Sequence, residues 1–285
     1  ALEFVEKGYS ESCQVIDIHG HIGPFYGAYL PSAMLEKMIK SLRHCRIRKI
    51  VCSHHTALAY DAELGNRLMQ EVIDQYPNYF LGYWLVNPNY PDLMKHDLEN
   101  FHKTRGFVGL KLWPDYHYVP ITSPKYAPAF EFANDYELLV LVHTFGGSPY
   151  DAPKFLGEVA VKYPNARFLM AHCGYGDWEI SASVAKNLPN VFLDLTSCVQ
   201  CIDFALMAGG SFMASARGGP FPVNGLIEYF VETAGSSKVI FGSDLPWYSQ
   251  HYHMGGVLFA HISDSDRHAI LHGNAEQLLG KFFVQ

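Results

Sequence analysis

The segment Leu138-Leu-Val-Leu-Val-His-Thr-Phe-Gly146 decides the fold class, because an unbroken apolar run ends there in one polar side chain and a turn. Ile50-Val-Cys and Phe168-Leu-Met-Ala are runs of the same kind. Strands that are buried on both faces have this composition, as in parallel sheets. Eight strand candidates occur along the chain: Gln14–Ile22, Lys49–His55, Phe80–Pro88, Phe107–Pro114, Leu138–Gly146, Arg167–Gly174, Asn190–Ser197 and Lys238–Pro246.

Segments with helical periodicity separate these strands. The helix candidates are Pro31–Arg46, Leu64–Tyr76, Asp92–Thr104, Lys125–Asp135, Pro153–Tyr163, Gly176–Asn187, Asn224–Ala234 and Ser263–Gly280. Strands that alternate with helices predict parallel βαβ units. An open doubly wound sheet would require a glycine-rich phosphate loop after the first strand, and His19-Gly-His-Ile-Gly-Pro is not such a loop. The predicted α/β fold is therefore a closed, parallel (β/α)8 TIM barrel, which typically needs ~250 residues.

The 285 residues are expected to form one barrel domain. Residues 1–13 would be an N-terminal arm, and the glycine-rich segment 198–222 would be a long loop after the seventh strand, near the active site. Cys198 and Cys201 form a CxxC pair without a second pair, so we expect the six cysteines to be free thiols.

Charge and hydropathy exclude several classes of protein. The chain has 21 Lys and Arg against 28 Asp and Glu, and this net charge of −7 opposes nucleic-acid binding. No apolar run reaches the ~18 residues of a membrane span, and the N-terminus does not read as a signal peptide. We predict a cytoplasmic protein with a small-molecule substrate as its partner; whether copies of the chain assemble into a homo-oligomer stays open.

Two histidines end the first predicted strand. His19 and His21 are two residues apart, so both side chains should point to the same side of a regular strand. The carboxyl end of a barrel strand is where TIM-barrel active sites lie, and imidazole is the commonest protein ligand of zinc. By the same alternation Asp17 should point inward as well, deeper in the barrel, and support a ligand or Lys111.

Three further strands also end in one polar side chain. These are His143 on the fifth, His172 on the sixth and Asp244 on the eighth. Burying an unpaired imidazole or carboxylate costs several kcal/mol, which a shared cation would offset. Lys111 ends the fourth strand. It is interpreted as a lysine that reaches solvent or an ion pair, as a partner of a substrate carboxylate, or as a modified lysine that bridges metals.

This ordered set resembles the amidohydrolase superfamily. It is most similar to the amidohydrolase-related branch of predicted metal-dependent TIM-barrel hydrolases, which includes aminocarboxymuconate-semialdehyde decarboxylase. The resemblance covers essentially the whole chain, including Phe-Gly-Ser-Asp-Leu-Pro around Asp244 and the C-terminal segment 273–280.

The resemblance implies a set of roles. His19, His21, His143 and Asp244 would hold one divalent metal ion, with zinc expected, and His172 and Lys111 are further candidates as ligands. One ion is favoured over two, although a carboxylated lysine bridges two ions in some members of the superfamily. Asp244 would take a proton from a metal-activated water, and His172 would polarise the substrate.

Substrate contacts are less strongly indicated. Trp113, Arg217 and Trp247 are the main candidates, and His54, Tyr116 and His117 also lie at predicted strand ends or in the loops after them. A second His-x-His pair, His251 and His253, is expected in a loop after the eighth strand and outside the metal site.

Three functions stay open at this point. The first is hydrolysis of an amide, lactone or ester-like bond in a small, carboxylated substrate. The second is non-oxidative decarboxylation of an unsaturated or aromatic acid. The third is a barrel without catalytic activity, against which the intact ligand set speaks.

Overall fold

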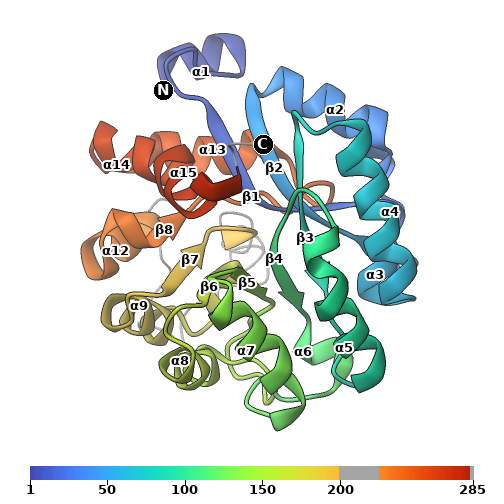
Figure 1. The fold of residues 1–285 in the computed structure, drawn as a ribbon. Coiled ribbons are helices and arrows are strands. Elements are labelled where there is room, and N and C mark those ends of the chain that lie inside the picture. Colours follow the sequence, from blue (N-terminus) through green and yellow to red (C-terminus); the bar gives the residue numbers. More distant parts are fainter. Residues whose placement is uncertain (199–224, 283–285) are drawn as a thin grey trace.

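The computed structural model describes residues 1–198 and 225–282, and it contains a barrel of eight parallel strands (Figure 1). The strands pair in chain order: β1 (Val15–Ile22), β2 (Ile47–His54), β3 (Phe80–Leu85), β4 (Phe107–Leu112), β5 (Leu139–Val142), β6 (Arg167–Met170), β7 (Val191–Asp194) and β8 (Val239–Ile240). The last strand returns to the first, because the Ile18 amide donates to the Phe241 carbonyl at 3.0 Å. The predicted (β/α)8 TIM barrel is confirmed.

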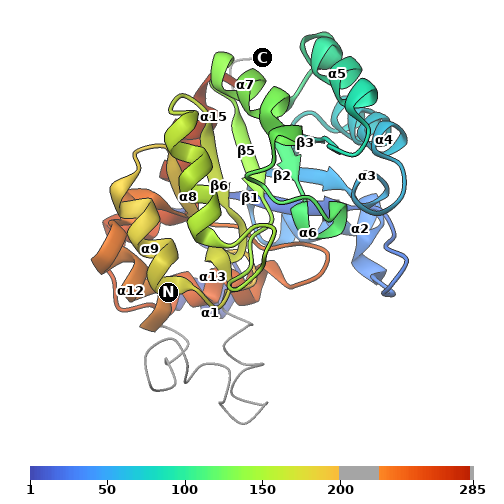
Figure 2. The same cartoon turned by 90° about the horizontal axis from the view of Figure 1, so that it is seen from below.

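Helices surround the barrel on the outside (Figures 1 and 2). They are α1 (Leu2–Lys7), α2 (Leu35–His44), α3 (His55–Ala59), α4 (Ala62–Gln75), α5 (Pro91–Asn100), α6 (Pro114–His117), α7 (Ala127–Asp135), α8 (Pro153–Lys162), α9 (Trp178–Asn187), α12 (Gly225–Ala234), α13 (Gln250–Phe259), α14 (Asp264–His268) and α15 (Asn274–Leu279). In the part of the chain that the structure describes, no helix is long and apolar enough to cross a membrane.

Two apolar layers explain the unbroken apolar strands. In β5, Leu139 and Leu141 pack with Ile16, Val51 and Ile240 in the barrel interior. The alternate residues Val140 and Val142 belong to the larger cluster between strands and helices. Strand β5 therefore buries both faces, and its first polar neighbour, His143, follows the last residue of the strand.

A β-bulge in β1 corrects the prediction for Asp17. The pairing of β1 with β2 shifts between Asp17 and Gly20, so that Ile18 packs in the interior and His19 follows it toward the barrel mouth. Asp17 points outward instead, where its carboxylate accepts hydrogen bonds from the Ser243 amide (3.0 Å) and Gln250 Nε2 (2.8 Å). Regular alternation fails at a bulge.

Other segments differ from the expected elements. His251 and His253 lie in helix α13 and not in a loop. The expected helix over Ser263–Gly280 is divided into α14, a π-helical turn at Ala269–Gly273 and α15. Nearly all of the predicted loop 198–222, including Cys201 and Arg217, lies outside the described residues. The cysteines that the structure does describe are buried, and none of them forms a disulfide.

Candidate active site

A cavity of about 290 Å³ opens at the carboxyl ends of the strands. It collects side chains from distant parts of the chain, and most of the sequence-predicted site residues line it. The lining residues that come from those predictions are His21, Lys111, Trp113, Tyr116, His143, His172, Asp244 and Trp247. This is the end of a TIM barrel at which active sites are built.

Two hydrogen bonds set the orientation of the β1 histidines. His19 Nδ1 lies 2.6 Å from Asp194 Oδ2, and His21 Nδ1 lies 2.9 Å from Ser53 Oγ. A carboxylate only accepts, so His19 Nδ1 carries the hydrogen and Nε2 keeps its lone pair. Burial lowers the pKa of both imidazoles, which keeps them neutral. The tautomer of His19, with its hydrogen on Nδ1 and a free lone pair on Nε2, is the one that metal binding through Nε2 requires.

The Asp244 carboxylate faces the two Nε2 atoms. Oδ1 lies 3.1 Å from His21 Nε2 and 3.7 Å from His19 Nε2, yet this buried oxygen receives no hydrogen bond. One ligand atom from each of the three residues lies within 4.8 Å of the others. A buried, unsatisfied carboxylate oxygen that faces neutral imidazole nitrogens fits a divalent cation, which would satisfy all three ligand atoms.

The backbone is strained where it places these groups. Asp244, His172 and Ser197 have φ values of 62°, 58° and 64°, in the left-handed region that residues other than glycine rarely adopt. Ser197 Oγ donates to Asp244 Oδ2 at 3.2 Å, and the Ser197 amide donates to His253 Nε2 at 3.1 Å. His253 thus holds Ser197 from the adjoining helix and lies outside the metal cluster.

A carbonyl group sets the tautomers of the other two histidines. His172 Nδ1 donates to the Thr196 carbonyl at 3.2 Å, so His172 Nε2 can accept from His143 Nδ1, also at 3.2 Å. Burial lowers the pKa of both rings. His143 Nε2 is thereby left with a free lone pair, as a ligand atom needs. His143 is not in the compact three-residue cluster, and its role as a metal ligand stays a prediction.

Lys111 is fully inside the site. It is 2% exposed, and its Nζ lies 3.1 Å from His19 Nε2. Burial lowers the pKa of Lys111 to about 8, against the attraction of Asp244 and Asp194. The Lys111 ammonium group thus lies against the lone pair of His19 Nε2, which is the lone pair that a cation would use.

Aromatic side chains form the cavity walls. Trp113 is buried and its ring packs on Tyr116 with centroids 3.4 Å apart, while Trp247 Nε1 donates to His55 Nε2 at 3.0 Å. His54 caps helix α3 by accepting a hydrogen bond from the Thr56 amide. His117 Nδ1 is hydrogen-bonded to the Tyr126 hydroxyl. Neither of these two histidines lines the cavity.

Four groups that orient the site were not predicted from the sequence: Ser53, His55, Asp194 and Ser197. Asp194 carried the clearest signal, because it is a polar residue at the end of the apolar strand Val191–Asp194, just as His143 and His172 are at theirs. His55 packs against His21 with ring centroids 5.0 Å apart, and it could be found only from the fold.

Comparison with known proteins places the chain in a family. Residues 16–281 match the family described as Amidohydrolase. The 2-keto-4-carboxy-3-hexenedioate hydratase of Sphingobium sp. (strain NBRC 103272 / SYK-6) is 25% identical over 265 residues, which is 76% of this chain and 70% of the relative.

Solved structures share the fold at low identity. The 2,6-dihydroxybenzoate decarboxylase from Rhizobium is 14% identical with a TM-score of 0.70, over 94% of this chain and 99% of that chain. The 5-carboxyvanillate decarboxylase from Novosphingobium aromaticivorans DSM 12444, complexed with manganese and 4-hydroxy-3-methoxy-5-nitrobenzoic acid, is 13% identical with a TM-score of 0.71, over 96% and 97%. Because the family match spans nearly all of the sequence, this protein belongs to the amidohydrolase family of enzymes.

Proposed function

We propose that the protein is a metal-dependent hydrolase that adds water to an amide, lactone or ester-like bond of a small carboxylated substrate. The observation that carries this proposal is the Asp244 carboxylate. It is the one acidic side chain among the described residues that line the cavity, and Ser197 Oγ donates a hydrogen bond to its Oδ2 atom. An ionised carboxylate beside the reacting groups begins the reaction as a proton acceptor.

The ligand set favours one divalent ion. His19, His21 and Asp244 would hold it, with His143 Nε2 as a further ligand. When bound, such an ion polarises substrate oxygen atoms and lowers the pKa of water. Asp244 would accept a proton and return it to the leaving group, and His172, fixed by the Thr196 carbonyl, would orient the substrate.

Lys111 supports the choice of a carboxylated substrate. The lone pair of His19 Nε2 cannot serve both Lys111 and a cation, so Lys111 would release it when the ion binds. Its buried ammonium group then needs a new partner of negative charge, which a substrate carboxylate supplies. The aromatic walls from Phe25, Trp113, Phe145 and Trp247 suit a flat, unsaturated molecule, and about 290 Å³ accommodates a small one.

Decarboxylation is the second candidate. The aromatic walls favour it, because a planar acid would lie between them with its carboxylate toward Lys111. Enzymes with this fold include the two decarboxylases named above. The named hydratase, in contrast, adds water to its substrate, as the first candidate does, although hydration cleaves no amide or ester bond.

Product analysis in oxygen-18 water separates the two candidates. The metal-loaded protein is incubated with lactones, amides and unsaturated or aromatic carboxylic acids. Incorporation of labelled oxygen without release of carbon dioxide supports hydrolysis, and release of carbon dioxide without incorporation refutes it.

An Asp244→Asn variant tests the role of this carboxylate. It should lose turnover while circular dichroism shows the native fold. Retained activity in the metal-loaded variant would contradict the proton role of Asp244.

A further inference from the structure

A second group of metal-ligating side chains lies at the opposite end of the barrel. Cys13 precedes β1, His268 ends α14, and His272 lies in the π-helical turn that follows. One ligand atom from each of these residues lies within 4.8 Å of the other two. Residues four apart project from the same face of a helix, which brings the two imidazoles together beside the start of β1.

The contacts inside this group leave one imidazole nitrogen, His272 Nδ1, without a hydrogen-bond partner. His268 Nδ1 and His272 Nε2 are 3.0 Å apart, so one of the two nitrogen atoms donates a hydrogen to the lone pair of the other. Without that hydrogen, both nitrogen atoms would have a lone pair to offer to a metal ion. His272 Nδ1 is buried and receives no hydrogen-bond partner, although Glu276 Oε2 is 3.3 Å away. A small rotation of the His272 ring would let it donate to this carboxylate.

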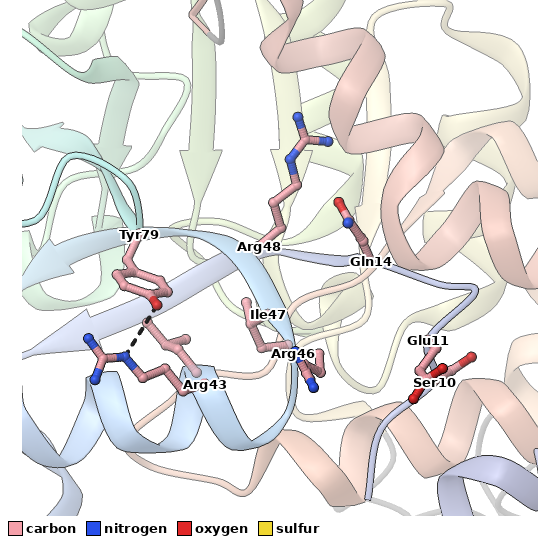
Figure 3. A pocket seen from close by; sticks show the side chains of 9 residues that line it. Ser10, Glu11, Gln14, Arg43, Arg46, Ile47, Arg48 and Tyr79 are labelled. Atoms are coloured by element: carbon pink, nitrogen blue, oxygen red, sulfur yellow. Dashed lines mark hydrogen bonds between the residues drawn. The ribbon is translucent and has the colours of Figure 1, made fainter. Parts of the chain in front are cut away.

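Arg48 holds the Glu276 carboxylate in place. Arg48 Nη1 donates to Glu276 Oε1 at 2.9 Å, from the amino end of β2. Arg48 and Gln14, the residue after Cys13, line one cavity of about 480 Å³ at this end of the barrel (Figure 3). A carboxylate that accepts from the second nitrogen of a histidine is the common support of a metal-bound imidazole.

We propose that Cys13, His268 and His272 form a second metal site, which binds zinc with a water molecule as fourth ligand and with Glu276 orienting His272. Thiolate sulfur and imidazole nitrogen are the ligands that zinc prefers. The His272 side chain is 23% exposed, so the ion can enter from solvent. The site would link Cys13, two residues before the first strand, to the last helices, and thereby hold both ends of the described barrel together.

Cobalt absorption of the full chain tests this site directly. A thiolate ligand gives Co²⁺ a near-ultraviolet charge-transfer band, which the active-site ligands, all nitrogen or oxygen, cannot produce. We expect the band to appear with one equivalent of Co²⁺ bound beyond the active site, and to be lost in Cys13→Ser and in His272→Gln.

Cys45→Ser is the matched control. Cys45 is also buried, and its Sγ lies 3.5 Å from His251 Nε2, yet it belongs to no group of three ligands among the described residues. The band should be unchanged in this variant. Absence of the band in the wild-type protein, its survival in Cys13→Ser, or its loss in Cys45→Ser would each overturn the proposal. Because the readout is absorbance and not turnover, failure of the proposed hydrolase function would leave this result unaffected.

Discussion

Replacing Asp194 with Asn should reverse the tautomer of His19. Asp194 Oδ1 accepts from both the amide and the hydroxyl of Thr196, while Oδ2 pairs with His19 Nδ1 at 2.6 Å. In the variant the amide oxygen must keep the Oδ1 position, because Thr196 presents two donors there. The amide NH2 group then faces His19 Nδ1, which has to accept, so the hydrogen moves to Nε2 and blocks the ligand atom.

The expected cost is a 10- to 100-fold loss of metal affinity. Loss of a group that orients a ligand typically has this effect, which corresponds to about 1.4–2.7 kcal/mol. The measurement is the dissociation constant for Mn²⁺ or Zn²⁺, from competition with a chelator at constant pH. Because Asn has nearly the volume of Asp, we expect the fold to be retained, and circular dichroism checks this.

Asp97→Asn provides the matched control for this prediction. Asp97 is buried in helix α5 and lines no part of the active-site cavity, so its replacement should leave metal affinity unchanged. If Asp194→Asn binds metal as tightly as the wild-type protein, the tautomer argument is wrong. Equal losses in both variants would also refute it, because the effect would then be a general one on stability.

Three further predictions concern stability and charge. Gly109→Ala should destabilise the fold by about 1–3 kcal/mol or more in chemical denaturation, because a Cβ there would lie 2.0 Å from the Leu139 carbonyl oxygen. Gly255→Ala is the control: the atom nearest to its Cβ would be 3.9 Å away, so this change should be neutral or stabilising. Burial raises the pKa of Asp97 to about 6, so its protonated form stabilises the fold below about pH 4 and this contribution is lost as the pH rises through 6. Asp97→Asn should therefore gain up to about 3 kcal/mol relative to wild type between pH 4 and 7, and equal pH profiles of unfolding would contradict this. Lys111→Met should retain or strengthen binding of one metal ion and raise KM for a carboxylated substrate, while loss of half the bound metal would instead indicate a bridging, carboxylated lysine.

Local pattern was sufficient to predict the barrel and the polar side chains that meet at its mouth. The alternation within Leu139–Val142 buries two residues inside the barrel and two outside it, so an unbroken apolar run already implied a strand covered on both faces. Polar residues at strand ends converge in any parallel barrel, which is why His21, His143, His172 and Asp244 line one cavity. Their assignment as metal ligands stays a prediction.

Only the tertiary structure determined which groups orient these side chains. A one-residue bulge in β1 directs Asp17 outward. The hydrogen-bond partner of His19 Nδ1 is instead Asp194, which lies 175 positions away in the chain. Hydrogen bonds between distant segments, such as Ser197 to Asp244, depend on backbone positions that no periodicity encodes. Strand and helix periods are local properties of the sequence, whereas the protonation and orientation of a buried histidine depend on whichever donor or acceptor folding places beside it.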